Sequence, residues 1–266
     1  LLYRLAFGLH PKKVLLPAPA FVEYEEALSA AGAQMEYYLM RDDFVIKEDI
    51  LEQITEETDF VVICNPNNPT GILTEKELIL RVLERAKETN TFVMADECFL
   101  EICQNESEYT VKPFIEKYEN LIILKSFTKL YAIPGVRLGF LFCGGQNRTE
   151  QIFNQLPEWN ISIIAEAAGL AALDETEYCN KTIPYIGKER AYLTAELEKL
   201  GIKVYPGEAD FLLIKTEHPL YEKLLKKKIL IRDCSNYRGL RTGYYRIAVK
   251  KHEENEKLIA QLKDTI

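Results

Sequence analysis

Residues 125–137 carry side chains whose types and spacing suit catalysis. They read Lys-Ser-Phe-Thr-Lys-Leu-Tyr-Ala-Ile-Pro-Gly-Val-Arg and place two hydroxyls (Ser126, Thr128), an amine (Lys129) and a guanidinium (Arg137) close together. Hydroxyl and guanidinium groups bind phosphate, and a lysine amine forms a Schiff base with an aldehyde. A lone lysine here would be a solvated surface charge, but the four groups together suit a ligand that carries both a phosphate and an aldehyde.

A second set of polar groups lies upstream. The apolar run 59–64 leads into Asn-Pro-Asn-Asn-Pro-Thr-Gly at 65–71, and the next apolar run, 91–95, ends at Asp96. Such Asn/Pro/Gly clusters are mostly turns, yet open α/β sheets bind ligands at this end of their strands, so Asn68 would face a crevice. A buried Asp96 needs an arginine or a protonated ligand nitrogen as partner, and the alternative is a strand-end cap. Together with residues 125–137, these groups predict a pyridoxal 5'-phosphate site.

Alternating patterns predict the elements that position these groups. Strand-like runs alternate with helical patterns along the first part of the chain. The helical patterns include 21–31, closed by Gly32, and 74–89, opened by a Thr74–Glu77 capping box. The strand-like runs are 14–16, 34–39, 59–64, 91–95, 121–124 and 136–143. This alternation predicts an α/β domain with a mainly parallel sheet and helices on both faces.

The pattern changes after about residue 155. A helical stripe of Leu193, Leu197 and Leu200 precedes short strand-like runs at 203–205, 211–214, 229–231 and 244–249, and a helix from about residue 253 closes the chain. These features predict a smaller α+β domain. We therefore divide the chain into a large domain at 1–160 and connecting helices with a small C-terminal domain at 161–266, and expect a continuous helix between them.

Composition excludes several classes of protein. A length of 266 residues with 47% hydrophobic and 28% charged residues fits a globular chain of one large domain, or of a large and a small one. A net charge of −8 argues against a nucleic-acid partner, and the apolar runs are far shorter than the ~18 residues that cross a membrane. Six scattered cysteines without a C-x-x-C pair predict reduced thiols in a cytoplasmic protein, with neither a disulfide framework nor a metal site.

The order of these motifs resembles a known family over nearly the whole chain. The chain is similar to the fold type I pyridoxal phosphate-dependent aminotransferases, in their histidinol-phosphate aminotransferase-like branch. The motifs that carry this resemblance are N-P-N-N-P-T-G, D-E after a strand, and S-F-T-K followed by A-I-P-G-V-R-L-G-F. The resemblance implies that Lys129 is the Schiff-base lysine, that Asp96 pairs with the pyridinium nitrogen and that Asn68 binds the ring oxygen. The other implied cofactor-binding residues are Ser126, Thr128 and Arg137 at the phosphate and Phe21 stacked on the ring.

The same resemblance assigns substrate-binding residues. Arg246 matches the family's carboxylate-binding arginine, and a guanidinium fork suits a carboxylate. The alternative for Arg246 is an edge-strand arginine that pairs with a surface acid. The resemblance also places Asn68 beside the substrate. Arg232 matches the position that binds a substrate phosphate in this branch, and its alternative is a salt bridge to Asp233 or to another nearby acid. Phe99 replaces a tyrosine that donates to the ring oxygen in many of these aminotransferases.

Two segments narrow the expected reaction. Residues 157–160 and 229–249 look more like the branch members that decarboxylate L-threonine O-3-phosphate than like its aminotransferases. The resemblance then implies release of CO2 and formation of (R)-1-amino-2-propanol O-2-phosphate for cobalamin synthesis. The alternative is a histidinol-phosphate or related class I/II aminotransferase.

The start of the chain leads to a further expectation. The chain begins Leu1-Leu2-Tyr3 inside a helical pattern, so we expect its natural N-terminal segment to be missing. In the family that segment supplies a phosphate loop, part of the small domain and an aromatic residue that reaches the other subunit's site. The family forms homodimers, which we expect here, and a non-catalytic truncated relative is a second alternative.

Overall fold

A six-stranded sheet organises the first half of the chain in the computed structural model, which describes residues 1–266 apart from the side chains of residues 146–148. Its strand order is β2-β1-β3-β4-β5-β6, and all neighbouring pairs are parallel except β5 and β6. The prediction of a mainly parallel α/β sheet is confirmed. The strands are β1 (Lys13–Ala18), β2 (Gln34–Leu39), β3 (Phe60–Cys64), β4 (Phe92–Asp96), β5 (Leu121–Ser126) and β6 (Gly139–Cys143).

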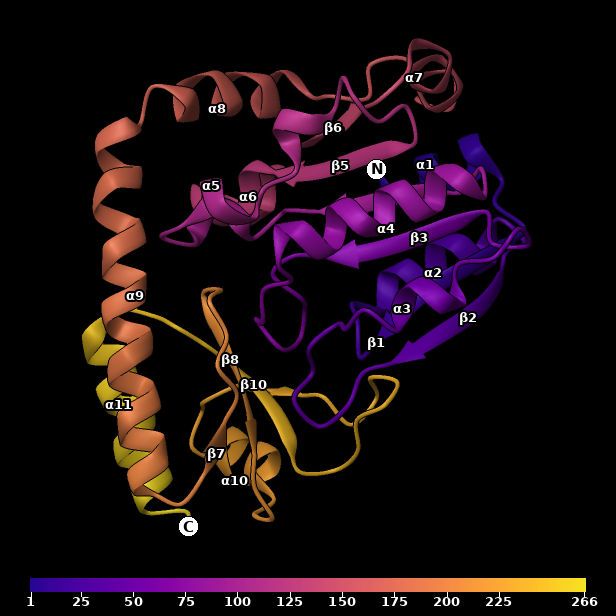
Figure 1. The fold of residues 1–266 in the computed structure, drawn as a ribbon. Coiled ribbons are helices and arrows are strands. Elements are labelled where there is room, and N and C mark those ends of the chain that lie inside the picture. The colour runs from indigo at the N-terminus through magenta and orange to yellow at the C-terminus, as the bar shows by residue number, and fades with distance from the viewer.

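Helices cover both faces of this sheet, because its central strands are apolar on both sides. Val61 of β3 faces a core with α4 (Lys76–Glu88), whereas its neighbour Val62 faces a separate core with α1 (Leu2–Leu9) and α2 (Val22–Ala30). Figure 1 shows these helices against the sheet. The remaining short elements here are α3 (Ile50–Gln53), η1 (Leu100–Ile102), α5 (Glu106–Tyr109), η2 (Lys112–Phe114), α6 (Phe127–Leu130), η3 (Pro134–Val136) and α7 (Gln146–Phe153).

A second, antiparallel sheet follows, in the order β7-β8-β10-β9. Leu193 and Leu197 are buried against it as the helical stripe predicts, with Leu200 partly buried. Tyr205 and Tyr244 join the core of the large sheet through Phe44, whose ring centroid lies 4.8 Å from that of Tyr205. The elements are β7 (Lys203–Val204), β8 (Phe211–Lys215), α10 (Leu220–Lys226), β9 (Arg232–Asp233), β10 (Tyr244–Ala248) and α11 (His252–Lys263).

Two helices, rather than one, connect the sheets. α8 (Ile163–Leu173) and α9 (Thr176–Lys199) run in different directions (Figure 1), so the expected continuous helix is wrong. The division of the chain at residues 160 and 161 stays a prediction. Among the described residues, no helix is long and apolar enough to cross a membrane.

Three other local predictions are corrected. Thr74 does not cap α4, because the helix begins at Lys76 with Glu75 as its N-cap residue and no side-chain cap. The Thr74 N–H donates to Asn65 Oδ1 at 2.8 Å. The run 229–231 is not a strand: its apolar pattern reflects the burial of Ile231, and pairing with β10 begins only at Arg232. The strand predicted over 136–143 begins at Gly139, because η3 occupies residues 134–136.

Candidate active site

The carboxyl ends of β3, β4 and β5 meet at one edge of the large sheet. In the parallel register Cys64 lies beside Asp96 and Asp96 lies beside Leu124. The turn at 65–71, Asp96 and the segment 125–129 therefore emerge side by side, at the edge where such sheets bind their ligands.

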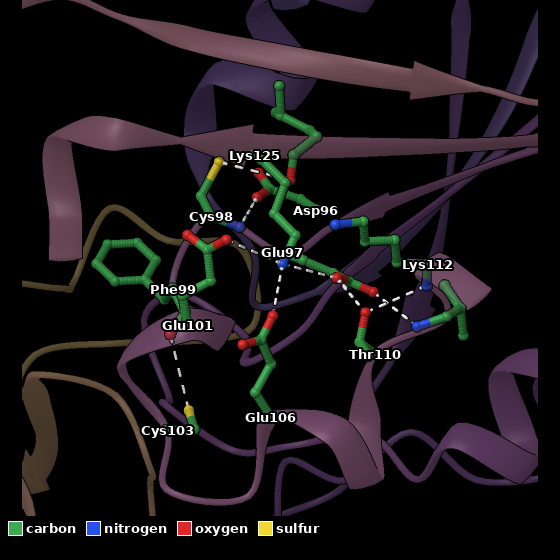
Figure 2. Close-up of polar contacts among 12 residues, drawn as sticks. Asp96, Glu97, Cys98, Phe99, Glu101, Cys103, Glu106, Thr110, Lys112 and Lys125 are labelled. Atoms are coloured by element: carbon green, nitrogen blue, oxygen red, sulfur yellow. Dashed lines mark hydrogen bonds and ion pairs between the residues drawn. The ribbon is translucent and has the colours of Figure 1, made fainter. Parts of the chain in front are cut away.

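Asp96 is a buried carboxylate held by two donors. Its side chain is buried, and the Tyr24 hydroxyl donates to Oδ2 at 2.5 Å. The backbone N–H of Cys98 donates to Oδ1 at 2.9 Å (Figure 2). Burial, together with the nearby charge of Asp96, raises the pKa of Tyr24 well above its usual value, so the phenol remains a donor. Tyr24 was not predicted as a site residue, although it follows Phe21 by one helical turn, and that spacing is the only local signal for it.

Lys129 lies on the short helix α6, which begins directly after Ser126. The Ser126 side chain accepts from the Thr128 N–H at 3.3 Å, and the two hydroxyl oxygens are 2.7 Å apart. Ser126 therefore caps the helix, as serine does at many helix N-termini. The Lys129 Nζ lies 4.7 Å from the centroid of the Phe99 ring, so the residue that departs from the family's tyrosine contacts the predicted catalytic amine.

Arg137 and Phe21 are placed less directly. Arg137 is exposed, and its Nη1 donates to the Pro134 carbonyl at 2.8 Å. Among the described side chains, no hydrogen bond joins Arg137 to Ser126 or Thr128, so its role at a phosphate stays a prediction. Phe21 immediately precedes α2 and contacts Tyr24 edge to face, with ring centroids 5.6 Å apart, and its stacking on a cofactor ring also stays a prediction.

The two arginines of the second sheet differ in their surroundings. Arg246 is half-buried, donates from Nη1 to Asn68 Oδ1 at 2.6 Å, and lies 4.9 Å from the centroid of Phe211. Arg232 is exposed and donates to Asn236 Oδ1 at 3.2 Å. Among the described residues it makes no ion pair with Asp233 or with another acid, so the predicted alternative of a salt bridge is not observed.

A cleft of about 740 Å³ brings four of the predicted residues together. Two aromatic rings line the cleft beneath its cations: Lys129 lies over Phe99, Arg246 lies over Phe211, and the two rings meet edge to face at 5.2 Å. Asn68 reaches this region through Arg246. The charged and polar residues of the lining are Thr128, Lys129, Asp210, Tyr221, Arg232, Asp233 and Arg246.

A buried ion-pair network fixes the strand ends behind the site (Figure 2). Lys125, at the end of β5, is 2% exposed, and its Nζ lies 3.1 Å from Glu97 and 3.0 Å from Glu106. Glu97 follows Asp96 and also accepts from the Thr110 hydroxyl at 2.8 Å and from a backbone N–H. Burial alone would lower the pKa of Lys125, but the neighbouring glutamates raise it overall, so the amine is charged. The network joins the residue after Asp96 to the strand that leads to Lys129.

We expect Lys125→Met to destabilise the protein by about 3–5 kcal/mol, because the buried Glu97 carboxylate loses its counter-charge. Thermal and urea unfolding at pH 7 would measure this change. The matched control is Lys181→Met, which removes an exposed ion pair with Glu177 and should cost about 0.5 kcal/mol or less. Since the pKa of Lys125 is raised in the folded state, its stabilising contribution should be present at neutral pH and lost as the pH rises through that pKa. Equal stability losses in the two variants would contradict this account of the network.

Comparison with known proteins identifies the family. Residues 2–262 match the family model for aminotransferase class I and II. The chain belongs to this family. It is 33% identical to a threonine-phosphate decarboxylase of Salmonella typhimurium, over 100% of this chain and 74% of that protein.

Two solved structures place the chain within this family. A histidinol-phosphate aminotransferase from Clostridium acetobutylicum has a TM-score of 0.93 and 32% identity, covering 98% of this chain and 80% of that one. An L-threonine-O-3-phosphate decarboxylase from Porphyromonas gingivalis has a TM-score of 0.86 and 27% identity, covering 99% and 79%. The fold is that of fold type I pyridoxal phosphate-dependent enzymes, as predicted.

Pyridoxal 5'-phosphate is the cofactor that family membership implies, and the donor set of the site fits it. Lys129 offers an amine for the aldehyde, and the paired hydroxyls of Ser126 and Thr128 offer donors for the phosphate. Asp96 offers a buried carboxylate, already oriented by Tyr24, for the ring nitrogen. The prediction of this cofactor is confirmed at the level of the family.

Proposed function

We propose that the protein decarboxylates L-threonine O-3-phosphate and forms (R)-1-amino-2-propanol O-2-phosphate, a building block for cobalamin. One observation carries the proposal: Arg232 and Arg246 line the same cleft as Lys129. A guanidinium binds a carboxylate or a phosphate through paired hydrogen bonds, and this substrate carries one of each. The Salmonella relative is named for this activity, which supports the proposal.

The residues of the chain divide the work as follows. Bound pyridoxal 5'-phosphate supplies an electron sink for the carbon that loses CO2. Asp96 would hold the proton of the ring nitrogen, and Tyr24 keeps that carboxylate in place. Arg246 would bind the substrate carboxylate and Arg232 the substrate phosphate, so the two arginines orient the bond that breaks. Lys129 would hold the aldehyde of the cofactor through its amine.

Arg232→Ala tests the assignment of the substrate phosphate. Loss of a charged hydrogen-bonding group costs about 1.5–3 kcal/mol, so KM for L-threonine O-3-phosphate should rise roughly 10- to 100-fold, with little change in cofactor affinity. The matched control is Arg238→Ala, since Arg238 pairs with Glu25 outside the cleft and should leave KM unchanged. A collapse of cofactor affinity in Arg232→Ala would show that Arg232 serves the cofactor phosphate instead.

A histidinol-phosphate aminotransferase is the second candidate. The TM-score of 0.93 with the Clostridium enzyme favours it, and Arg232 would serve a substrate phosphate there too. That reaction transfers the amine and produces glutamate from 2-oxoglutarate, whereas the proposed reaction releases CO2. The presence of Asn68, Asp96, Lys129 and Arg246 argues against a non-catalytic relative.

We also propose that the protein forms a homodimer. The surface before and along α8 exposes large apolar side chains: Trp159 at 93%, Ile163 at 80% and Ile164 at 74%. Large apolar side chains exposed close together in the chain are typical of a protein interface. Sedimentation velocity should give twice the chain mass of 30.7 kDa, and Ile164→Glu should shift the protein toward the monomer. A wild-type monomer at micromolar concentration would contradict this proposal.

A further inference from the structure

Asp210 is an acid in the cleft to which neither the motifs nor the family resemblance gave a role. It immediately precedes β8, and its backbone carbonyl accepts from the Val249 N–H at 2.8 Å, which fixes its position beside the end of β10. Its side chain lines the same cleft as Lys129 and Arg246. Among the described residues it makes no ion pair, and its own backbone N–H lowers the pKa of the carboxyl group slightly against the effect of burial.

The charges around Asp210 come from several elements. Lys129 approaches from α6 and Arg246 from β10, while Arg232 and Asp233 lie on β9 and Tyr221 on α10. Burial raises the pKa of Asp210, and the positive charges of Lys129 and Arg246 offset this only in part. A carboxyl group without an ion pair in a catalytic cleft, with its pKa moved toward neutrality, suits proton transfer.

Substrate binding would change this balance. The proposed function places the substrate carboxylate at Arg246, which lines the same cleft as Asp210. The substrate then brings a negative charge into the cleft. It also pairs with Arg246, whose positive charge had favoured the ionised form of Asp210. Both effects favour protonation of Asp210. By linkage, binding of a carboxylate should therefore draw a proton from solvent.

We propose that Asp210 takes up a proton when the substrate carboxylate binds and gives that proton to the carbon from which CO2 leaves. This inference rests on the proposed function. The bond between the amine-bearing carbon and the carboxylate breaks, CO2 departs, and the electron pair of that bond forms the new C–H bond with the proton of Asp210. The ionised carboxylate then regains a proton from solvent when the next substrate binds, so protons and electrons balance over one turnover.

The first test measures proton uptake and needs no turnover. The probe is 3-(phosphonooxy)butanoate, which carries the carboxylate and the phosphate of the substrate but has no amine. Calorimetric titration of the cofactor-loaded protein between pH 5 and pH 8, in buffers of different ionisation enthalpy, gives the protons taken up per ligand. Wild type should exceed Asp210→Asn by up to about one proton, and Asp210→Glu should restore the uptake. Titration of the ligand phosphate cancels in this difference.

Asp233→Asn is the matched control, because Asp233 lines the same cleft but already accepts from the Ser235 N–H at 2.8 Å. It should retain the wild-type uptake. Equal uptake in wild type and Asp210→Asn would overturn the linkage between binding and protonation of Asp210.

The second test concerns catalysis. The kcat for CO2 release should fall about 100-fold in Asp210→Asn, while KM should not rise, because the neutral amide needs no protonation when the substrate carboxylate binds. Wild-type kcat in this variant would overturn the proton transfer from Asp210. If wild type itself released no CO2, the proposed function would fail, whereas a proton uptake that depends on Asp210 would still establish the binding step.

Discussion

Replacing Lys129 with alanine is expected to lower turnover by roughly 10⁶-fold, the scale seen when a covalent catalytic residue is removed. The variant should also lose the visible absorbance of a pyridoxal cofactor joined to a lysine amine. Both effects follow because Lys129 is the lysine of the cleft that Arg232 and Arg246 also line. Absorbance spectra and single-turnover assays with added pyridoxal 5'-phosphate would measure them.

Two variants separate the amine of Lys129 from its charge. Lys129→Arg keeps the positive charge but has no amine to bind the aldehyde, so it should be as inactive as the alanine variant. Lys215→Ala removes a lysine at the end of β8, whose Nζ lies 5.2 Å from the Tyr244 ring and outside the cleft lining, and it should keep the wild-type spectrum. An unchanged spectrum in Lys129→Ala would contradict the assignment of the cofactor lysine.

Asp96→Asn should have the second-largest effect. A neutral amide cannot hold the ring nitrogen in its protonated form, so we expect kcat to fall by about 10²–10³-fold even at saturating cofactor. The cofactor dissociation constant should rise as well, because the variant replaces a charged hydrogen bond with a neutral one. Steady-state assays and titration of the apoprotein with pyridoxal 5'-phosphate would measure the two effects.

Tyr24→Phe is the matched variant for this position. It removes the hydroxyl that donates to Asp96 at 2.5 Å but keeps the carboxylate, and the Cys98 N–H still donates to the other oxygen. Its activity should lie between those of wild type and Asp96→Asn. Wild-type kcat in Asp96→Asn would contradict the role of Asp96, and a more severe loss in Tyr24→Phe would show that the hydroxyl itself serves the cofactor.

Sequence patterns were sufficient to predict which strand ends carry the site. The buried runs before Asn65, Asp96 and Lys125 are short and apolar, and parallel strands bring their carboxyl ends to one edge of a sheet. The structure has this arrangement. The specific motif at 125–137 then placed Lys129 at the edge, because the chemistry of a phosphate and an aldehyde requires neighbouring hydroxyl and amine groups.

Contacts between residues far apart in the chain could not be predicted in this way. Lys125 gave no sign of burial in the sequence, since lysine is rarely buried without a partner and its glutamate partners lie 19 to 28 positions upstream. The contact between Asn68 and Arg246 spans 178 positions. Asp210 carries no motif, and only the packing of β8 and β10 against the large sheet brings it into the cleft.

The most direct measurement of the central claim compares two reactions of the protein loaded with pyridoxal 5'-phosphate. One sample contains L-threonine O-3-phosphate and is assayed for CO2 and for 1-amino-2-propanol O-2-phosphate. The other contains histidinol phosphate with 2-oxoglutarate and is assayed for glutamate, and Lys129→Ala serves as the blank in both. We predict equal amounts of CO2 and aminopropanol phosphate in the first sample and no glutamate in the second. Glutamate without CO2 would contradict the decarboxylase and make the protein an aminotransferase.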